Sequence, residues 1–556
     1  MQSVLAERPI TDPILLNWED FSISNWVFRK MANSVERVLR YLLPTVKVGQ
    51  FRPDAGSVYI PNWAPDAFGV CGFILELTAG YHQVLCKGWP PVNDWDAFLA
   101  DNSKRWFETG EIPSPLKESW MRILHTKGTR IEVIKDAPHE YTELLHDLLK
   151  ICLVADEMMK NIFLAYDVDS EDGTLALLKW IDNFFQRKTL NQDLDKTIAL
   201  VLPKNLTPQV GMSFRSLTNN VGLWRNLEVE PRWDPLGLSS IRETKDLYIL
   251  VIPWPYEIES KSFHTIKNPD VDPAEGYGFF GHSPSENKDL LLSHVDKMID
   301  YAEEIAGAVH GVVFPELSMT ANVYDALEER LKDRVSFAVT GIENDGANEL
   351  RLMYSLGDGS GVITGTQKKH HRWKVDRRQI TQYGLGKQLS VDNDWWEHTP
   401  LDKRSLLFFQ INQSVAATAL ICEDLARQDP VAKLVRTMGP NLVFALLMDG
   451  PQLPERWSGR YATVLADDPG SSVLTVTSLG MALKSECRDG VSKPLRNIAL
   501  WRDAIQGNRK IELKENQGAV LLHTTFERRM QNTADRRAPV PRPVPVLKDV
   551  FQISLE

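Results

Sequence analysis

The chain has 556 residues, which allows several domains, and 43% of its residues are hydrophobic and 25% are charged. This balance is typical of a soluble globular protein and excludes a wholly disordered or collagen-like chain. A formal net charge of −11 excludes the uniformly basic character of a general nucleic-acid binder and leaves room only for a local basic patch.

The cysteines and the N-terminal sequence bear on the compartment. The five cysteines are widely spaced and contain no C-x-x-C pair, which argues against a disulfide framework and a zinc knuckle. The first residues lack the basic and apolar regions of a secretory signal, and no apolar run reaches the roughly 18 residues that span a bilayer. We therefore expect a cytoplasmic protein that does not enter the membrane.

Residues 1–240 are predicted to form a mainly helical domain of unknown role. Apolar residues recur at three- and four-residue intervals over 25–46, 141–166 and 175–185, which is the spacing of amphipathic helices. Residues 58–80 mix short apolar stretches with glycine and proline. The prolines and the glycine of EVEPRWDPLGLS (228–239) disfavour a continuous helix and predict a domain boundary there.

Residues 241–530 are predicted to form an α/β layered domain, because short β-rich runs alternate with helical stretches. The predicted strands are 248–252, 311–315, 335–341, 415–421, 441–447 and 472–478. The glycine-rich segment GDGSGVITGTQKK (357–369) lacks the spacing of a phosphate-binding loop and predicts a hairpin turn between strands.

Two further segments carry local signals. Ser283, Pro284 and Glu286 predict the start of a helix by their capping pattern. The apolar residues expected on the buried face of this helix are Leu290, Leu291, Val295, Met298, Ile299 and Ala302. Residues 531–556 are predicted to be a proline-rich tail, extended in a polyproline conformation over 536–546 and not packed.

Three reactive side chains stand at the ends of predicted strands, where α/β folds expose side chains to a crevice. Glu316 lies in FPELS (314–318), Lys369 in a basic run, and Cys422 in ICED (421–424). Each segment alone also fits a structural interpretation: a carboxylate at a helix start, a solvated basic face and a buried inert cysteine. The ordered set of three is the more specific signal.

With these motifs in this order, the stretch from Asp246 to Glu527 resembles the carbon–nitrogen hydrolase, or nitrilase, superfamily. The resemblance also rests on K-x-H at 369–371 and on a strand, helix and strand over 441–480. It implies a nitrilase-like four-layer α-β-β-α sandwich and homo-oligomers, either dimers or larger. It further implies a hydrolase that cleaves a non-peptide C–N bond in a small amide or nitrile through a Cys thioester acyl-enzyme.

The resemblance assigns roles to the three side chains. Glu316 would be the general base, Lys369 the electrostatic stabiliser and Cys422 the nucleophile. A thiol with a pKa of about 8.5 needs a neighbouring base and a cation before it attacks well, so the residue types suit these roles. The backbone N–H of Glu423, the residue after Cys422, is expected to stabilise the developing oxyanion together with the lysine.

The substrate-pocket candidates are His371, Arg372 and Tyr324. Lys368 is the alternative catalytic lysine, because neighbours on a strand point to opposite faces and only one of the two lysines can reach the thiol. We favour Lys369 because the resembling pattern has a histidine two residues after its lysine, matched here by His371.

Two departures from the family pattern leave roles open. The segment 373–386 lacks the family's second glutamate, so Asp376 or Glu397 is expected to replace it unless the role is empty. The asparagine usual in the strand before the lysine is also missing, since Ser355 follows Tyr354. The histidines form no H-E-x-x-H pattern or His/Cys cluster, and we expect neither a metal nor a cofactor.

Two other functions are compatible with the sequence. A nitrilase-like sensor or regulatory scaffold with weak or partner-dependent catalysis would account for the large helical domain, through which a protein or nucleic acid would bind. The basic run 368–378 and the Trp395-Trp396 pair fit a nucleic-acid-associated factor, including one from phage defence, where such domains also occur. The same cations would suit an acidic or phosphorylated substrate.

Overall fold

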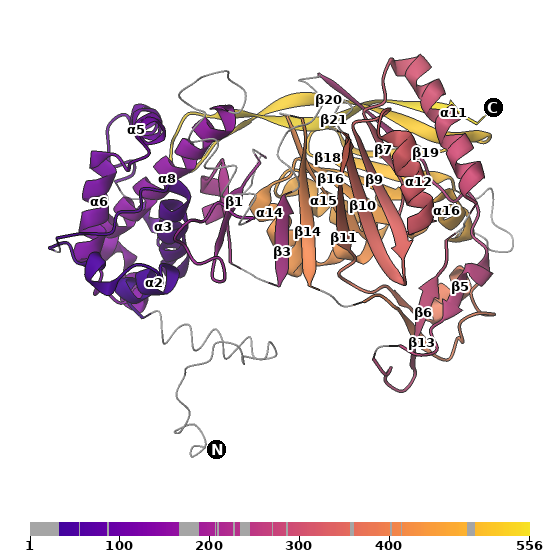
Figure 1. Ribbon diagram of the computed structural model, residues 1–556, viewed down its shortest axis with the longest axis horizontal. Coiled ribbons are helices and arrows are strands. Elements are labelled where there is room, and N and C mark those ends of the chain that lie inside the picture. The colour runs from indigo at the N-terminus through magenta and orange to yellow at the C-terminus, as the bar shows by residue number, and fades with distance from the viewer. Residues whose placement is uncertain are drawn as a thin grey trace. The chain divides into compact units, whose positions relative to one another are not determined.

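The computed structural model describes residues 33–54, 56–85, 88–165, 188–205, 207, 211–225, 228–233, 245–269, 271–284, 287–355, 361–400, 403–412, 414–485 and 495–555. The chain divides into two compact units, one of residues 1–180 and 191–199 and the other of residues 181–190 and 200–556. Among the described residues, the first unit is helical and the second is rich in β-sheet (Figure 1). None of the described helices combines the length and apolar character that crossing a membrane requires.

The first unit is built around two buried helices. Its described helices are α2 (Val35–Leu42), α3 (Ala64–Thr78), α4 (Tyr81–Val84), α5 (Trp95–Thr109), α6 (Ser114–His125), α7 (Ile131–Asp136) and α8 (Thr142–Ala165), with 3₁₀ turns at Val48–Phe51 and Pro138–Tyr141. Helix α3 is buried on nearly all sides, and α8 packs against α3, α5 and α6. A helix that is apolar all round needs such a central place.

A buried carboxylate ties the end of this unit to α3. The side chain of Asp66 accepts hydrogen bonds from the backbone N–H groups of Gln192, Asp193 and Leu194, at 2.9, 2.7 and 3.3 Å. Burial raises the pKa of Asp66 to about 6, although the three N–H donors oppose that rise. The segment 191–199 is therefore anchored to the central helix by one side chain.

The helical predictions fare differently along this unit. Helix α8 confirms the helix predicted over 141–166, whereas the one predicted over 25–46 is described only from Val35 to Leu42. Residues 25–32 and 175–185 lie outside the described residues. The proline of the 58–80 segment does not prevent a helix, because Pro65 sits in the first turn of α3, where a backbone N–H has no partner to lose.

Two large sheets make up most of the second unit. In the order of paired neighbours, the first contains β11 (Val362–Lys368), β10 (Ala347–Ser355), β9 (Phe337–Asn344), β7 (Gly311–Val313), β4 (Asp246–Val251), β20 (Gln517–Gln531) and β21 (Val540–Ser554), with β8 (Met319–Thr320) beside β9. The second contains β19 (Gly507–Glu512), β18 (Asn497–Asp503), β17 (Ser472–Thr477), β16 (Leu442–Leu447), β15 (Val415–Ile421), β14 (Arg404–Asn412) and β3 (Val229–Trp233).

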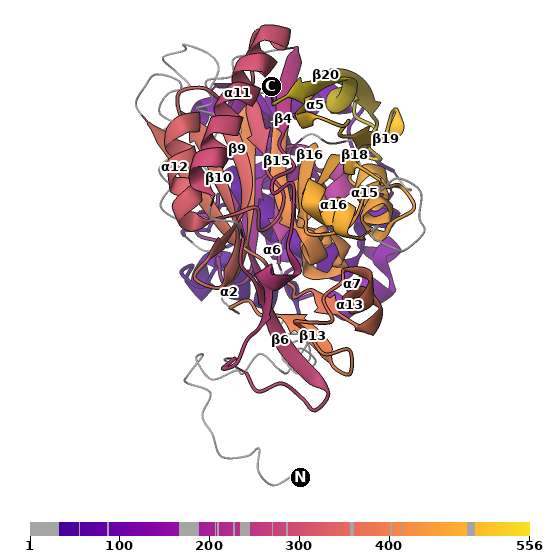
Figure 2. The same cartoon turned by 90° about the vertical axis from the view of Figure 1, so that its right-hand side faces the viewer.

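Helices cover the outer face of each sheet. On the first sheet lie α11 (Lys288–Ala306) and α12 (Ala321–Leu331), and on the second lie α15 (Trp457–Asp467) and α16 (Leu479–Ser485), with α14 (Lys433–Met438) nearby. Figure 2 shows the resulting succession from α11 and α12, through β9 and β10, then β15 and β16, to α15 and α16. The predicted α-β-β-α sandwich is thereby confirmed.

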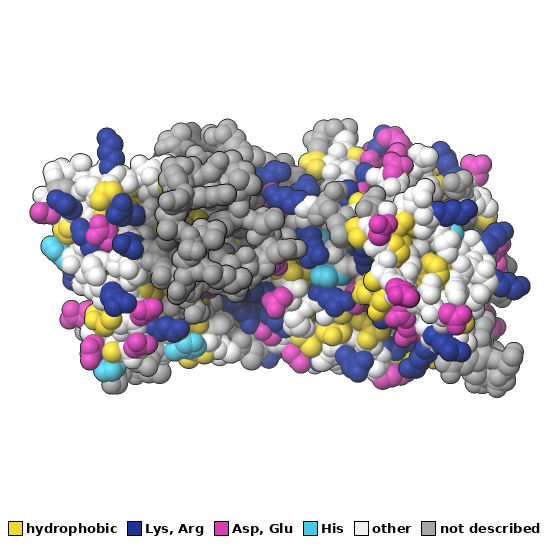
Figure 3. Space-filling view, turned by 90° about the horizontal axis from the view of Figure 1, so that it is seen from below, with side chains coloured by type: hydrophobic (Ala, Val, Ile, Leu, Met, Phe, Trp, Pro, Cys, Tyr) yellow, Lys and Arg dark blue, Asp and Glu magenta, His cyan; other side chains and the backbone are white. Residues whose placement is uncertain are grey.

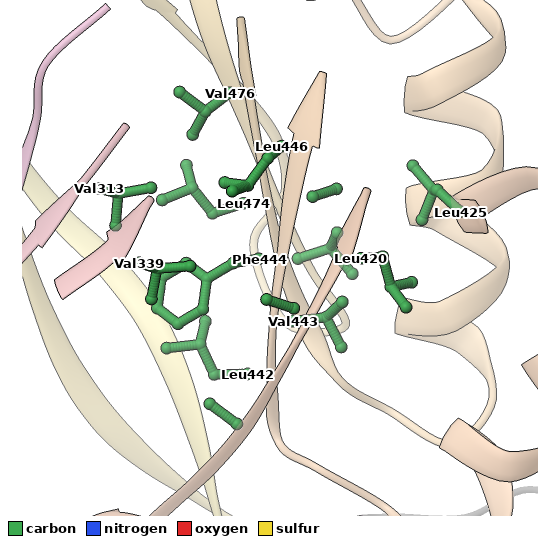
Figure 4. Close-up of a cluster of buried hydrophobic side chains, with 14 of the residues drawn as sticks. Val313, Val339, Leu420, Leu425, Leu442, Val443, Phe444, Leu446, Leu474 and Val476 are labelled. Atoms are coloured by element: carbon green, nitrogen blue, oxygen red, sulfur yellow. The ribbon is translucent and has the colours of Figure 1, made fainter. Parts of the chain in front are cut away.

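The core between the sheets explains the long apolar runs of the central strands. Strands β15, β16 and β17 are buried along their whole length, because one face meets helices and the other meets the opposite sheet. Figure 4 shows Phe444 of β16 lying toward Val313 and Val339 of the facing sheet. Its ring centroid is 6.2 Å from that of Phe337 on β9, so aromatic contacts join the two sheets.

Smaller elements complete the second unit. A third sheet, called the small sheet below, pairs β12 (Lys374–Val375), β13 (Asp394–Glu397), β6 (Tyr277–His282) and β5 (Phe263–Thr265) in that order. The hairpin of β1 (Leu200–Pro203) and β2 (Val221–Trp224) and the short helices α10 (Phe214–Leu217) and α13 (Arg377–Gln382) lie outside the large sheets. The 3₁₀ turns Ser260–Ser262 and Cys422–Ala426 and the π-turn Gln428–Ala432 are the remaining described elements.

The boundary predicted at residue 240 differs from the observed division. The sheet-rich unit takes in β1 and β3, both of which precede that residue. Strand β3 contains Pro231 and pairs in parallel with β14 at the edge of the second sheet. Proline is tolerated on an edge strand, so the prolines of this segment do not mark the end of a domain.

The expectation of an unpacked tail at 531–556 is wrong. Residues 540–554 form β21, which pairs antiparallel with β20 at the edge of the first sheet. The prolines at 541, 543 and 545 fall on every second residue. Because alternate residues of an edge strand direct their N–H groups away from the partner strand, this spacing leaves the ladder intact.

The start of α11 also differs from its prediction. The N-cap is Asn287, whose side chain accepts from the backbone N–H of Leu290, and not Ser283. Glu286 lies outside the described residues. The predicted buried face is confirmed by Leu291, Val295, Met298, Ile299 and Ala302, whereas Leu290 is exposed because it stands in the first turn on the solvent side.

Candidate active site

Glu316 lies just beyond the end of β7. Its side chain is buried, and the chain turns sharply after it, since Leu317 has a left-handed backbone with φ of +48°. Strand β9 passes close by: a Cβ on Gly341 would lie 2.5 Å from the Cα of Glu316. Only glycine permits this approach, so the position of the carboxylate depends on the residue type at 341.

Lys369 directly follows β11 and is equally buried. Its ammonium donates to Oε1 of Glu316 at 2.8 Å and to Oε2 of Glu397. Burial alone would lower the pKa of Lys369, but the two carboxylates outweigh burial and hold that pKa well above its ordinary value. The lysine is therefore a permanent cation with one N–H left for a further acceptor.

Asn348 and Glu397 complete a buried ionic cluster. The amide of Asn348, near the start of β10, donates to Oε1 of Glu316 and to Oε1 of Glu397, both at 2.7 Å. The backbone N–H of Trp373 donates to Oε2 of Glu397 at 3.0 Å. Each carboxylate is thus held by several donors, as buried charges require.

Of the two residues expected to replace the second glutamate, Glu397 contacts the lysine. Asp376 instead caps α13, where its side chain accepts from the backbone N–H of Gln379 at 2.9 Å. Asn348 was not predicted, because the expected position of an asparagine was next to Tyr354 at the other end of β10. The sequence feature that marks Asn348 is its position directly after the β9–β10 turn. In the structure it pairs with Glu343 of β9.

Cys422 follows β15 on a strained turn. Its backbone is left-handed, with φ of +45°, and its side chain is buried. For a residue with a Cβ this conformation costs about 1 kcal/mol or more, and it is enriched at functional sites. The chain therefore changes direction at Cys422, directly after the last residue of β15.

The thiol and the carboxylate interact electrostatically. Burial and then the charge of Glu316 raise the pKa of Cys422 well above its ordinary value, while Lys369 and a hydrogen bond from the backbone of Met448 oppose the rise. Burial also raises the pKa of Glu316, with Glu397 adding to the rise and Lys369 countering it. The resting form of Cys422 is consequently the thiol, and Glu316 holds a proton more readily than an ordinary glutamate does.

One oxygen of Glu316 stands apart from the cluster. Oε1 receives both hydrogen bonds, from Lys369 and Asn348, whereas the buried Oε2 has no partner among the described residues. A buried carboxylate oxygen without a donor is uncommon in folded proteins. It is the atom of Glu316 available to receive a proton.

Gln367 fixes the lysine strand against the cysteine strand. Its side chain donates to the carbonyl of Ala419 on β15 at 3.0 Å and accepts from the backbone N–H of Leu407 on β14 at 2.8 Å. Since Gln367 lies on β11 of the opposite sheet, these bonds join the two sheets two residues before Lys369. The spacing of the cluster is thus set by the sandwich itself.

A cavity of about 260 Å³, the catalytic cavity below, opens onto this cluster. Glu316, Asn348, Glu397, Trp373 and Met448 are among its lining residues. So are Glu343 and three histidines, namely His264, His282 and His398, and no lysine or arginine is in its lining. Burial lowers the pKa of His282 to about 3, so that imidazole is neutral.

The other predicted pocket residues lie elsewhere. His371 and Arg372 line a second cavity of about 490 Å³, and Lys368 lines neither cavity. Tyr324 lies on α12 in the core outside the first sheet, where its hydroxyl donates to Oε2 of Glu328 at 2.9 Å. The structure therefore does not bring Tyr324 to the catalytic cavity, because α12 covers the opposite face of that sheet.

The proposed nucleic-acid surface is not assembled as expected. Trp395 is only 8% exposed, because it packs in the core beneath the small sheet. Lys374 of the basic run forms an ion pair with Asp394. On the face seen in Figure 3, Lys and Arg side chains alternate with Asp and Glu over the described residues.

Metal ligands were sought throughout the described part of the chain. No group of three or more His, Cys, Asp or Glu side chains there is arranged to hold a metal ion. Of the acids that line the catalytic cavity, Glu316 and Glu397 each form an ion pair with Lys369.

The chain is similar to several solved structures over about half of its length. No protein-family model and no curated protein matches the sequence. Among solved structures, the chain is similar to Nit3 of Saccharomyces cerevisiae, a member of branch 10 of the nitrilase superfamily, with 11% identity over 52% of this chain and 92% of that one and a TM-score of 0.31. It is also similar to an amidase from Nesterenkonia sp., with 14% identity, 52% and 92% coverage and a TM-score of 0.29.

A third similar structure is a larger protein. The glutamine-dependent NAD+ synthetase of Acinetobacter baumannii matches with 12% identity over 50% of this chain and a TM-score of 0.30. The match spans 45% of that synthetase, less than half of its length.

Proposed function

We propose that the chain is a carbon–nitrogen hydrolase that cleaves a small amide or nitrile with Cys422 as its nucleophile. The observation that carries this proposal is the buried cluster of Glu316, Lys369 and Glu397 beside a cysteine on a strained turn. Three charged side chains are costly to bury, and such clusters with perturbed pKa values are concentrated at functional sites.

In the first half of the reaction, the thiol attacks the substrate carbonyl. The proton of Cys422 passes to the unpartnered Oε2 of Glu316 as the S–C bond forms. Negative charge develops on the carbonyl oxygen, and the third N–H of Lys369 together with the backbone N–H of Glu423 stabilises it. The C–N bond then breaks, and the leaving amine takes the proton from Glu316.

In the second half, water hydrolyses the thioester. Glu316 takes a proton from the water as its oxygen bonds to the acyl carbon, and the oxyanion again faces Lys369. The C–S bond breaks, the carboxylic acid leaves, and Cys422 regains its proton. Glu397 holds the lysine in place throughout, and the cavity of about 260 Å³ that Glu316 and Glu397 line would receive a small acyl group.

The test is the rate at which a small haloacetamide labels Cys422, followed by intact mass and paired with turnover of a panel of small amides and nitriles. Cys422→Ala should abolish the fast label and turnover, and Glu316→Gln should slow both by about 100- to 10,000-fold. Lys369→Ala should lower turnover by about 100-fold or more, since it removes an oxyanion donor.

Lys368→Ala is the matched control for Lys369→Ala, because it removes the neighbouring lysine and leaves the ion pairs of Lys369 with Glu316 and Glu397 in place. It should leave turnover within about twofold of wild type. Thermal unfolding of each variant separates loss of chemistry from loss of fold. A Cys422 that labels no faster than it does in the denatured protein would contradict the proposal.

A further inference from the structure

The small sheet is a wall between the two cavities. On β6, Phe280 and His282 line the catalytic cavity, whereas Tyr277 and Phe279 line the second. Side chains alternate between the two faces of a strand, which explains the division. No residue appears in the lining of both cavities, so the second cavity is a separate site.

The second cavity is positively charged. Arg372 and Arg404 are the cations of its lining and Asp272 is its acid. His370 and His371 also line it, and burial lowers the pKa of His370. Arg404 begins β14 and forms no ion pair with any described residue. A guanidinium beside a cavity without an internal partner is suited to bind an external anion, because its fork of N–H donors matches carboxylate and phosphate oxygens.

Asp424 holds His371 in one orientation. Nδ1 of His371 donates to Oδ1 of the buried Asp424 at 2.8 Å. In an imidazole with this tautomer Nε2 is an acceptor, which suits a hydroxyl group of a ligand. Asp424 also accepts from the backbone N–H of His370, at 3.1 and 3.2 Å. One carboxylate thus fixes the segment that lines the cavity.

Aromatic rings line the same cavity. Trp396 is half-buried and Tyr277 is 39% exposed. The ammonium of Lys374 lies 5.9 Å from the Trp396 ring and 5.7 Å from the Tyr277 ring, and the guanidinium of Arg372 lies 4.9 Å from the ring of Phe279. Trp396 and Tyr277 come from neighbouring strands of the small sheet. Partly exposed rings next to cations favour a ligand that has a flat ring as well as a negative charge.

We propose that the second cavity binds an aromatic anion of the nucleoside monophosphate class. Arg404 and Arg372 hold the phosphate, and Trp396 and Tyr277 contact the ring. The volume of about 490 Å³ lies within the usual range of small-molecule sites. This site does not depend on the chemistry of Cys422, since the two linings are separate.

Calorimetric titration of the full chain tests the site with three probes: adenosine 5′-monophosphate, adenosine and inorganic phosphate. The monophosphate should bind at least tenfold more tightly than either adenosine or phosphate, because only it carries both recognised parts. Equal affinity for phosphate alone would overturn the assignment of an aromatic ligand, and absence of binding up to millimolar monophosphate would overturn the site.

Variants locate the binding. Arg404→Gln and Trp396→Ala should each weaken binding of the monophosphate at least tenfold, and Arg404→Lys should give an intermediate loss because it keeps the charge without the fork. Arg378→Gln is the matched control, since this exposed arginine of the same basic run lies outside the cavity. Unchanged affinity in Arg404→Gln, with an unchanged unfolding temperature, would contradict the proposal.

Discussion

The two faces of the small sheet have opposite chemistry. The catalytic cavity has carboxylates and imidazoles in its lining, and the one cation of its ionic cluster, Lys369, is held between two of those carboxylates. The second cavity has two guanidinium groups and a single carboxylate, that of Asp272, in its lining, whereas histidines and aromatic rings occur in both cavities. Adjacent residues such as Trp396 and Glu397 face different cavities.

This contrast shows how far sequence proximity can mislead. The cations that follow Lys369 in the chain suggest an acidic substrate next to the nucleophile. Because the chain leaves β11 directly before Lys369, the next three residues, 370–372, line a different cavity, and Trp373 lines the first one again. An acidic ligand is therefore expected in the second cavity and not in the catalytic one.

Glu397→Gln is expected to give the largest difference between the two cavities, because it should lower kcat and leave binding in the second cavity unchanged. This change places an amide where Lys369, Asn348 and Trp373 all donate, so the lysine loses one of its two anchors. We expect kcat to fall by about 100-fold, comparable to the loss of an oxyanion donor. The affinity of the second cavity for the monophosphate should stay within twofold, as measured by calorimetry.

Asp376→Asn is the control for this experiment, because Asp376 was the other residue expected to replace the second glutamate. Asparagine keeps the helix cap, so kcat should stay within about twofold of wild type and the unfolding temperature should stay the same. If Glu397→Gln retained more than half of the wild-type kcat, Glu397 would have no part in positioning the lysine.

The pH dependence of the reaction should identify the base. Because burial raises the pKa of Glu316, this carboxylate takes up a proton at a higher pH than an ordinary glutamate, and the protonated form cannot accept the proton of the thiol. Activity is therefore lost as pH falls. We expect kcat/KM to decrease tenfold per pH unit once the pH falls below the pKa of Glu316. That pKa should lie above the usual glutamate value of about 4.3.

The Glu316→Gln variant provides the comparison. Burial also raises the pKa of Cys422, so without the base the labelling rate should rise tenfold per pH unit from neutral to alkaline pH as the thiol ionises. An acidic limb of kcat/KM that persisted unchanged in Glu316→Gln would assign the titrating group to another residue.

The parts of the fold that the sequence predicts are those whose environment is uniform. Strands β15, β16 and β17 lie between a sheet and helices, so each is a continuous apolar run and is recognisable by itself. The pairing of β21 with β20 depends on which side of a proline-rich strand is covered. The sequence of residues 540–554 does not show which side of the strand is paired, so by itself this segment resembles a free tail.

The candidate site divides in the same way. Glu316, Lys369 and Cys422 each end a predicted strand and carry a motif, so they are found in the sequence. Glu397 was one of two alternatives in the sequence, and only its place on the small sheet decides between it and Asp376. Asn348 comes to the cluster through the β9–β10 turn. Its role depends on distances between elements, which neither residue type nor spacing along the chain reports.

The smallest expected effect concerns the charge of the substrate. An amide that carries an amine should be hydrolysed faster than a matched amide that carries a carboxylate, because Glu343 lines the catalytic cavity without a cation. A partly exposed ion pair contributes up to about 1 kcal/mol, which corresponds to a preference of about two- to fivefold in kcat/KM. Glu343→Gln should remove that preference, whereas Asp345→Asn, on the neighbouring exposed turn, should keep it. Faster turnover of the carboxylate-bearing amide would mean that the cations of the second cavity, and not the acids of the catalytic cavity, determine which substrate is accepted.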